Sequence, residues 1–218
     1  MIRRYDSGAA FLAENQAFLD TKPQISAFMA LDAPLLEKTD KINYAARCEK
    51  DGKTLLAMKV EPYHLQLFGD ADCAGELLDF LVRGGYEIQN YLSEKTLGDA
   101  AAREMEARFG IRYEEALAMA FMEARTLTEP SSPEVEAANE DDLDEIYVCM
   151  ERFLVECNLQ DKPNREAMRR NIGGFRVIRA DGKIVSVGKA VRDIGESMRI
   201  TNVYTREAYR GKGYARKV

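Results

Sequence analysis

The chain has 218 residues, more than the roughly 100 to 150 residues of a usual single domain. Its 46% hydrophobic and 31% charged residues, with only 15 Gly and 6 Pro, indicate a packed globular protein and exclude disordered and collagen-like classes. The 37 acidic residues exceed the 31 basic ones and give a net charge of −6, so we expect no nucleic-acid partner. Any site for an anion must therefore be local.

The sequence contains no apolar run of about 18 residues and no apolar core of a signal peptide behind its first residues. We therefore expect a cytoplasmic protein with no membrane partner. The cysteines include no Cys-x-x-Cys pair, and the single histidine is His64, so neither a metal site nor a disulfide framework is expected. We interpret all the cysteines as small buried hydrophobes: Cys48, Cys73, Cys149 and Cys157.

The first half of the chain alternates predicted helices and strands. An Asp-Gly pair at Asp51 predicts a two-residue hairpin turn, because this pair adopts the positive φ values that such a turn needs. The turn joins strands over 44–49 and 54–60. The other predicted elements are helices over 7–19 and 25–36, a strand over 64–68, a helix over 71–82, a strand over 87–92 and a helix over 97–109. This alternation is typical of α/β folds.

The segment 115–127 allows two interpretations. Its Ala, Met and Glu residues favour a helix, whereas Leu117, Met119 and Phe121 alternate as in a strand. We favour the strand, and we expect Met119 and Met122 in the core. The stretch 129–133, which is polar and bracketed by prolines, is the best linker in the chain.

The second half repeats the order of elements that the first half shows up to and including its hairpin. Asn139 is placed to cap a helix whose apolar stripe extends to Cys157, and a second helix over 163–172 should end where Gly173 and Gly174 take a left-handed conformation. A second Asp-Gly pair, at Asp181, predicts a hairpin between strands over 175–179 and 184–191. One architecture used twice is the simplest interpretation.

The last residues carry the clearest chemical signal. An extended run ends in a loop in which Gly211 and Gly213 allow the main chain to approach a ligand and to turn N–H groups towards it. A helix that should begin there adds partial positive charge. Basic residues gather around the loop, although the chain as a whole is acidic: Arg206, Arg210, Lys212, Arg216 and Lys217. The pattern predicts a cradle for a diphosphate.

The order of strand, two helices, three strands and a loop reading YRGKGYA resembles the GNAT superfamily of N-acetyltransferases. The resemblance covers 135–218. It implies an α/β (α+β) protein with tandem GNAT-like folds, each a mixed, mostly antiparallel sheet flanked by helices. The implied organisation is a degenerate N-terminal domain over 1–128, a linker over 129–133 and the N-terminal part of a catalytic domain over 134–218.

The resemblance also implies roles for single residues. Main-chain groups of Val203, Tyr204 and Thr205 would line the acyl-pantetheine arm of acetyl-CoA. The pyrophosphate would be held by a loop of consecutive residues: Arg210, Gly211, Lys212, Gly213, Tyr214 and Ala215. The implied reaction is transfer of an acetyl group to an amine-bearing acceptor of unknown identity. The alternative is a CoA-binding sensor or interaction module without catalysis.

The chain departs from the family pattern in several places. In the first copy, Asp70 and Asp72 stand where the second copy has basic residues, and they should repel a diphosphate. Arg199 occupies the usual position of the acidic base, which leaves Glu196 as the nearest substitute; a solvated turn residue is the other interpretation of Glu196. The strand and the Tyr that follow the phosphate loop in the family cannot be placed, so we expect a fragment of a longer protein.

Other polar features have ordinary structural interpretations. A hydrogen bond to backbone is favoured over catalysis for His64. The acidic run 140–145 is interpreted as a solvated helix start, with attraction of a cationic acceptor as the alternative. The basic cluster near the end could instead be a nucleic-acid arm, but it is short and interrupted by glycines.

Overall fold

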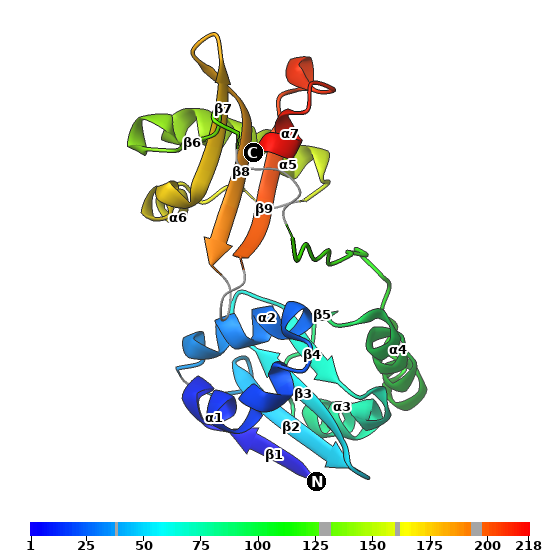
Figure 1. The fold of residues 1–218 in the computed structure, drawn as a ribbon. Helices are drawn as coiled ribbons and strands as arrows, with labels where there is room; N and C mark the ends of the chain where they lie inside the picture. Colours follow the sequence, from blue (N-terminus) through cyan, green and yellow to red (C-terminus); the bar gives the residue numbers. More distant parts are fainter. Residues whose placement is uncertain (38, 127–131, 160–161, 193–197) are drawn as a thin grey trace. The chain divides into compact units, whose positions relative to one another are not determined.

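The computed structural model describes residues 1–37, 39–126, 132–159, 162–192 and 198–218 (Figure 1). The chain divides into two compact units, Met1–Glu123 and Ala124–Val218. The predicted linker 129–133 lies partly outside the described residues. Each unit is an α/β structure built around one sheet. No helix among the described residues is both long and apolar enough to cross a membrane.

The first unit contains a sheet in the order β1-β2-β3-β4-β5, in which all neighbours are antiparallel except the parallel pair β4 and β5. Its strands are β1 (Ile2–Tyr5), β2 (Tyr44–Lys50), β3 (Lys53–Lys59), β4 (Leu65–Gly69) and β5 (Tyr91–Leu92). Its helices are α1 (Gly8–Leu19), α2 (Pro23–Asp32), α3 (Ala74–Arg83) and α4 (Lys95–Phe109), with short 3₁₀ turns at Ala33–Leu35 and Ala71–Cys73.

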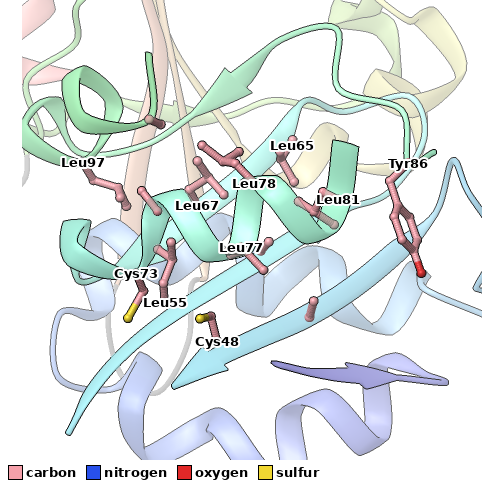
Figure 2. Packing of buried hydrophobic residues seen from close by; sticks show 14 of the residues in the cluster. Cys48, Leu55, Leu65, Leu67, Cys73, Leu77, Leu78, Leu81, Tyr86 and Leu97 are labelled. Carbon is pink, nitrogen blue, oxygen red and sulfur yellow. The ribbon is translucent and has the colours of Figure 1, made fainter. Parts of the chain in front are cut away.

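Residue alternation along these strands creates two buried faces. On one face, Tyr5 packs edge-on against Phe11 of α1, and Phe68 of β4 packs against Phe18. On the other face, α3 and α4 cover the strands, with a core centred on Leu55, Leu65 and Leu77. Figure 2 shows this second core, in which the leucines of α3 lie against the strands. Both faces of the sheet are therefore covered by helices.

The second unit has a four-stranded sheet in the order β6-β7-β8-β9, with antiparallel neighbours throughout. Its strands are β6 (Glu136–Ala137), β7 (Phe175–Ala180), β8 (Lys183–Arg192) and β9 (Met198–Thr205). Its helices are α5 (Leu143–Glu156), α6 (Arg165–Arg170) and α7 (Tyr214–Lys217), with 3₁₀ turns at Glu140–Asp142, Ile172–Gly174 and Glu207–Tyr209. Ile146, Cys149 and Met150 of α5 pack on Val177, Val187 and Tyr204 of the sheet.

Predictions based on local signals are confirmed. Both Asp-Gly turns have positive φ at each central residue, 50° and 77° at Asp51 and Gly52, and 51° and 74° at Asp181 and Gly182. The side chain of Asn139 accepts from the Asp141 N–H, and the Asp142 carboxylate accepts from the Asn139 N–H, which forms a capping box. The sequence therefore placed both hairpins and the cap at Asn139 correctly; the capped element is the 3₁₀ turn Glu140–Asp142, which leads directly into α5.

Several other predictions are wrong. Residues 115–126 of the expected strand have no regular structure, and Leu127 lies outside the described residues. Met119 and Met122 are 57% and 94% exposed instead of buried, and Cys157 is exposed, unlike the other cysteines. The predicted strand over 87–92 is reduced to β5. Gly173 and Gly174 lie within a 3₁₀ turn without a positive φ, because α6 ends earlier, at Arg170.

Candidate functional site

The glycine-containing loop after β9 turns sharply at two positions. Arg210 is extended, with φ −69° and ψ 161°, and Gly211 and Gly213 follow with φ of 75° and 79°. Both angles lie in the left-handed region, which glycine adopts without a steric penalty. Gly213 is the residue that precedes the first turn of α7, and no side chain caps this turn. Both positions therefore adopt the backbone conformation for which the sequence analysis expected glycine.

The main-chain amides of the loop differ in their hydrogen bonding. The N–H of Arg210 donates to the carbonyl of Glu207 at 3.1 Å, so this amide is already engaged within the protein. The N–H groups from Gly211 to Ala215 have no acceptor among the residues that the structure describes. Because α7 has only four residues, its dipole adds little, and the amides themselves carry the site.

Most of the basic side chains near the loop are neutralised by partners in the second unit. Arg206 donates to the Ile184 carbonyl at 2.6 Å and lies 3.4 Å from the Glu145 carboxylate, and Lys217 pairs with Glu134 at 2.8 Å. Lys212 lies over the Tyr209 ring at 5.2 Å and forms no ion pair within the described part of the chain. The predicted concentration of positive charge is therefore weaker than the sequence suggests.

A hollow of about 600 Å³ lies beside the loop. This volume is within the range of small-molecule sites. The end of β9, the last turn of α5 and the loop form its walls, through Phe153, Glu156, Cys157, Val203, Tyr204, Thr205, Tyr209, Arg210, Gly211, Gly213, Tyr214, Ala215 and Arg216. Most of the predicted site residues thus surround one hollow, and Lys212 is the loop residue outside its lining.

Strand β9 carries a β-bulge next to this hollow. Val187 pairs with Tyr204 and Lys189 pairs with Thr201, so Gly188 of β8 faces both Asn202 and Val203. Asn202 has a φ of 55°, an uncommon value for a residue with a side chain. Bulges of this kind are frequent beside active sites, where they redirect main-chain groups. Because β9 is the edge strand among the described strands, its outer side faces away from the sheet partner.

The side chains of the three predicted β9 residues are mostly directed elsewhere. The Tyr204 side chain lies in the core of the second unit, and Thr205 Oγ1 lies 2.8 Å from Ser186 Oγ. Burial first, and the neighbouring Glu156 carboxylate second, raise the pKa of Tyr204, which keeps its hydroxyl protonated. Main-chain groups of β9 are thus what the strand can present to a ligand, although the Thr205 carbonyl already accepts from Arg210 Nε at 2.8 Å.

Sequence reasoning missed four residues of the hollow, Phe153, Glu156, Cys157 and Tyr209, of which Glu156 and Cys157 bring polar groups from the end of helix α5. Glu156 and Cys157 come from the last turn of α5, and Glu156 lies 2.6 Å from the Arg210 guanidinium. The only sequence signal was their position at the end of an amphipathic helix. Their proximity to a loop more than fifty residues later depends on how α5 packs against β9. Such a contact has no local signature.

The candidate catalytic residue Glu196 lies outside the described residues. Arg199, which stands where an acidic base was expected, lies in β9 opposite Val191. In the first unit, Asp70 Oδ2 accepts from the Thr54 N–H at 2.9 Å, and Asp72 forms an ion pair with Lys53. Asp70 is the N-cap residue of the 3₁₀ turn Ala71–Cys73, and Asp72 lies in its first turn, but the carboxylate of Asp70 does not hydrogen-bond to the turn, because it accepts from β3 instead.

Comparisons with known proteins give one distant likeness to report. No protein-family profile matches the chain, and no curated protein matches it. A solved acetyltransferase of the GNAT family from Colwellia psychrerythraea is similar over 100% of this chain and 82% of that chain, with a TM-score of 0.49 and 11% sequence identity. This likeness concerns the fold at a low level of similarity, and it assigns no activity or residue role to this chain.

Proposed function

We propose that the second unit binds acetyl-CoA and transfers its acetyl group to an amine. The observation that supports this most is the run of N–H groups from Gly211 to Ala215 without an acceptor among the described residues, at the wall of a hollow of about 600 Å³. A diphosphate offers several oxygen acceptors in a small volume, which suits consecutive amides in a tight loop. The Lys212 ammonium adds a positive charge near the same loop.

The pantetheine arm would extend from the loop along β9. It contains two amide groups, which can form hydrogen bonds with the outer edge of a strand as a peptide does. The bulge at Asn202 and Val203 redirects main-chain groups at this edge. One of these groups would polarise the thioester carbonyl, because an N–H aimed at a developing oxyanion lowers the barrier for acyl transfer.

The reaction would proceed by direct attack. The neutral amine attacks the thioester carbonyl carbon, the carbon–sulfur bond breaks, and CoA leaves as the thiolate while the amine loses a proton. Glu196 stays the proposed proton acceptor. Glu156 is the carboxylate among the described residues of the hollow, and Arg210 already engages it. The acceptor is defined only as an amine.

A second function, a CoA-binding sensor without catalysis, is favoured by two observations. Arg199 replaces the expected acid in β9, and the carboxylate that reaches the hollow is held in an ion pair. Under this function, CoA would occupy the loop and no acyl group would move.

Mass spectrometry after incubation with acetyl-CoA and a panel of small amines separates the two functions. Formation of the acetylated amine together with free CoA supports the transferase. Saturable binding in calorimetry without any product supports the sensor. Absence of binding at high micromolar acetyl-CoA, with the protein folded, would contradict both.

A further inference from the structure

The first unit contains a cavity of its own, with a volume of about 610 Å³. It lies where β4 and β5 stop pairing. These parallel strands are joined by only two residue pairs, Leu65 with Tyr91 and Gln66 with Leu92. The residues beyond these paired positions, 67–71 and 93–97, line the cavity together with residues of α2. The cavity is thus a consequence of the sheet opening, in a unit for which we propose no catalytic role.

An irregular segment crosses this cavity as a strap over 113–121. One end is fixed by Tyr113, whose ring packs on Tyr91 at 5.0 Å and whose hydroxyl donates to the Ile88 carbonyl at 3.1 Å. Near the other end, Phe121 packs on Phe28 of α2 at 6.2 Å. Between these anchors, residues 116–120 are exposed and form no main-chain hydrogen bond with other described residues. A segment that is fixed near its two ends, with few contacts between them, can move at its centre.

Two apolar side chains of the strap face the cavity although the strap is exposed. Met119 and Phe121 line it and are 57% and 48% exposed, whereas the neighbouring Met122 does not line it and is 94% exposed. The apolar lining as a whole consists of Ile25, Phe28, Met29, Leu67, Phe68, Ala71, Leu92, Leu97, Met119 and Phe121. Partly exposed apolar side chains beside a cavity gain free energy when an apolar molecule covers them.

The charged groups at the cavity compensate one another. Lys22 pairs with Glu94 at 2.9 Å, and Lys95 is shared between Asp99 at 3.0 Å and Glu115 at 3.2 Å. Asp70 accepts from the main chain of β3, and Gln66 donates to Asp32 at 2.6 Å. Within the lining itself, Lys22 and Lys95 are matched in number by Asp70 and Glu94, so the lining carries no net charge. The cavity therefore differs in character from the loop of the second unit, which offers N–H groups to an anion.

We propose that this cavity binds an uncharged, mostly apolar small molecule, over which Met119 and Phe121 close. Its volume suits a ligand of that size, and its lining offers aromatic and aliphatic contact with hydroxyl groups of Ser93 and Thr96 at the margin. A macromolecular partner is disfavoured because the strap covers the cavity. The proposal is independent of acetyl transfer in the second unit.

Fluorescence titration of the full chain with the neutral probe N-phenyl-1-naphthylamine tests the proposal. The double variant Met119→Ala/Phe121→Ala should bind the probe about tenfold more weakly, because it loses apolar contact with the bound molecule. The matched control is Leu117→Ala/Met122→Ala, which removes one exposed side chain of the strap and its exposed neighbour, neither of which lines the cavity, and should bind like the wild type. All these side chains are exposed, so folding should persist, as circular dichroism can verify.

An excess of CoA should leave probe binding unchanged, which separates this site from the hollow of the second unit. Three results would each overturn the proposal: no saturable binding, equal weakening in both double variants, or displacement of the probe by CoA.

Discussion

The guanidinium of Arg210 connects the end of a strand to the end of a helix. Its Nε donates to the carbonyl of Thr205, the last residue of β9, at 2.8 Å, and its Nη2 donates to Glu156 at the end of α5 at 2.6 Å. The side chain also lies over the Tyr204 ring at 5.5 Å. Arg210 therefore acts as a brace at the base of the loop, and its charge is already balanced by Glu156.

This pairing predicts that Glu156→Gln tightens CoA binding. The glutamine keeps the size of the side chain, while a negative charge at the wall of the hollow disappears and the positive charge of Arg210 is left uncompensated. We expect affinity to rise about threefold to fivefold at low salt, and this gain should shrink at high salt. Stability should change by less than about 1 kcal/mol, because both partners are largely exposed.

Isothermal titration calorimetry at two salt concentrations measures this effect. Glu207→Gln is a suitable control, because it removes a carboxylate near the loop but not from the lining of the hollow. Weaker binding by Glu156→Gln at low salt would show that the brace, rather than the charge, dominates.

Gly213→Val should abolish CoA binding without unfolding the protein. The φ of 79° at Gly213 is strongly unfavourable for a branched residue, so the loop should change conformation and its amides should lose their common direction. Gly182→Val is the matched control, because Gly182 has a φ of 74° and, like Gly213, has open space around its Cβ position. Both variants should lose stability, as measured by thermal unfolding. Equal CoA affinity of the two variants would contradict the assignment of the loop.

Cys157 should be the cysteine that reacts first with iodoacetamide in the native protein. It is exposed and lines the hollow, whereas the other three are buried. Burial raises the pKa of Cys149 and Cys73, and it raises the pKa of Cys48 to about 11, so little reactive thiolate is present in them. Peptide mapping by mass spectrometry should find alkylation at Cys157, slowed by saturating CoA. Reaction at Cys157 that CoA does not slow would argue against occupancy of this hollow.

The capping box before α5 should make the stability of the second unit sensitive to acid. Burial opposes ionisation of Asp142, but hydrogen bonds from Arg179 and from the Asn139 amide, together with the Arg179 charge, lower its pKa. The stabilisation is complete above the ordinary value of 3.8 and is lost as the pH falls below it, through the lowered native pKa. At neutral pH, Asp142→Asn should cost about 2 kcal/mol, since it leaves Arg179 with a weaker partner.

Chemical denaturation at neutral pH and at about pH 2 to 3 measures this difference. The exposed neighbour Asp141 provides the control variant Asp141→Asn, which should change stability by less than about 0.5 kcal/mol. A cost of Asp142→Asn that stays constant down to the lowest pH would rule out the ion pair as its source.

The sequence predicted those features that depend on neighbouring residues. The two Asp-Gly turns and the Asn139 cap depend on φ preferences and on side chains within three residues, so they could be placed directly. The segment 115–126 alternates as a strand does, but a strand also needs a pairing partner, and β5 is only two residues long. Consequently, Met119 and Met122 are exposed instead of buried.

The candidate site also combines features that neighbouring residues determine with features that depend on long-range packing. The left-handed conformations of Gly211 and Gly213 follow from the residues themselves. The bulge at Asn202 depends on the register between β8 and β9, and the contact of Glu156 with Arg210 depends on the packing of α5. The charges of Arg206 and Lys217 counted towards an anion site in the sequence, but their ion pairs are formed only in the folded unit. Long-range pairing decides these features, and a single sequence does not encode it in a recognisable local pattern.

Amide NMR of the isotopically labelled full chain, titrated with CoA and its fragments, tests the central claim most directly. If the loop holds the diphosphate, CoA and 3′-dephospho-CoA should both shift the N–H signals from Gly211 to Ala215 in a saturable manner. Pantetheine, which has no diphosphate, should leave those signals in place. Loop signals that do not move at saturating CoA, or that move equally with pantetheine, would contradict the account.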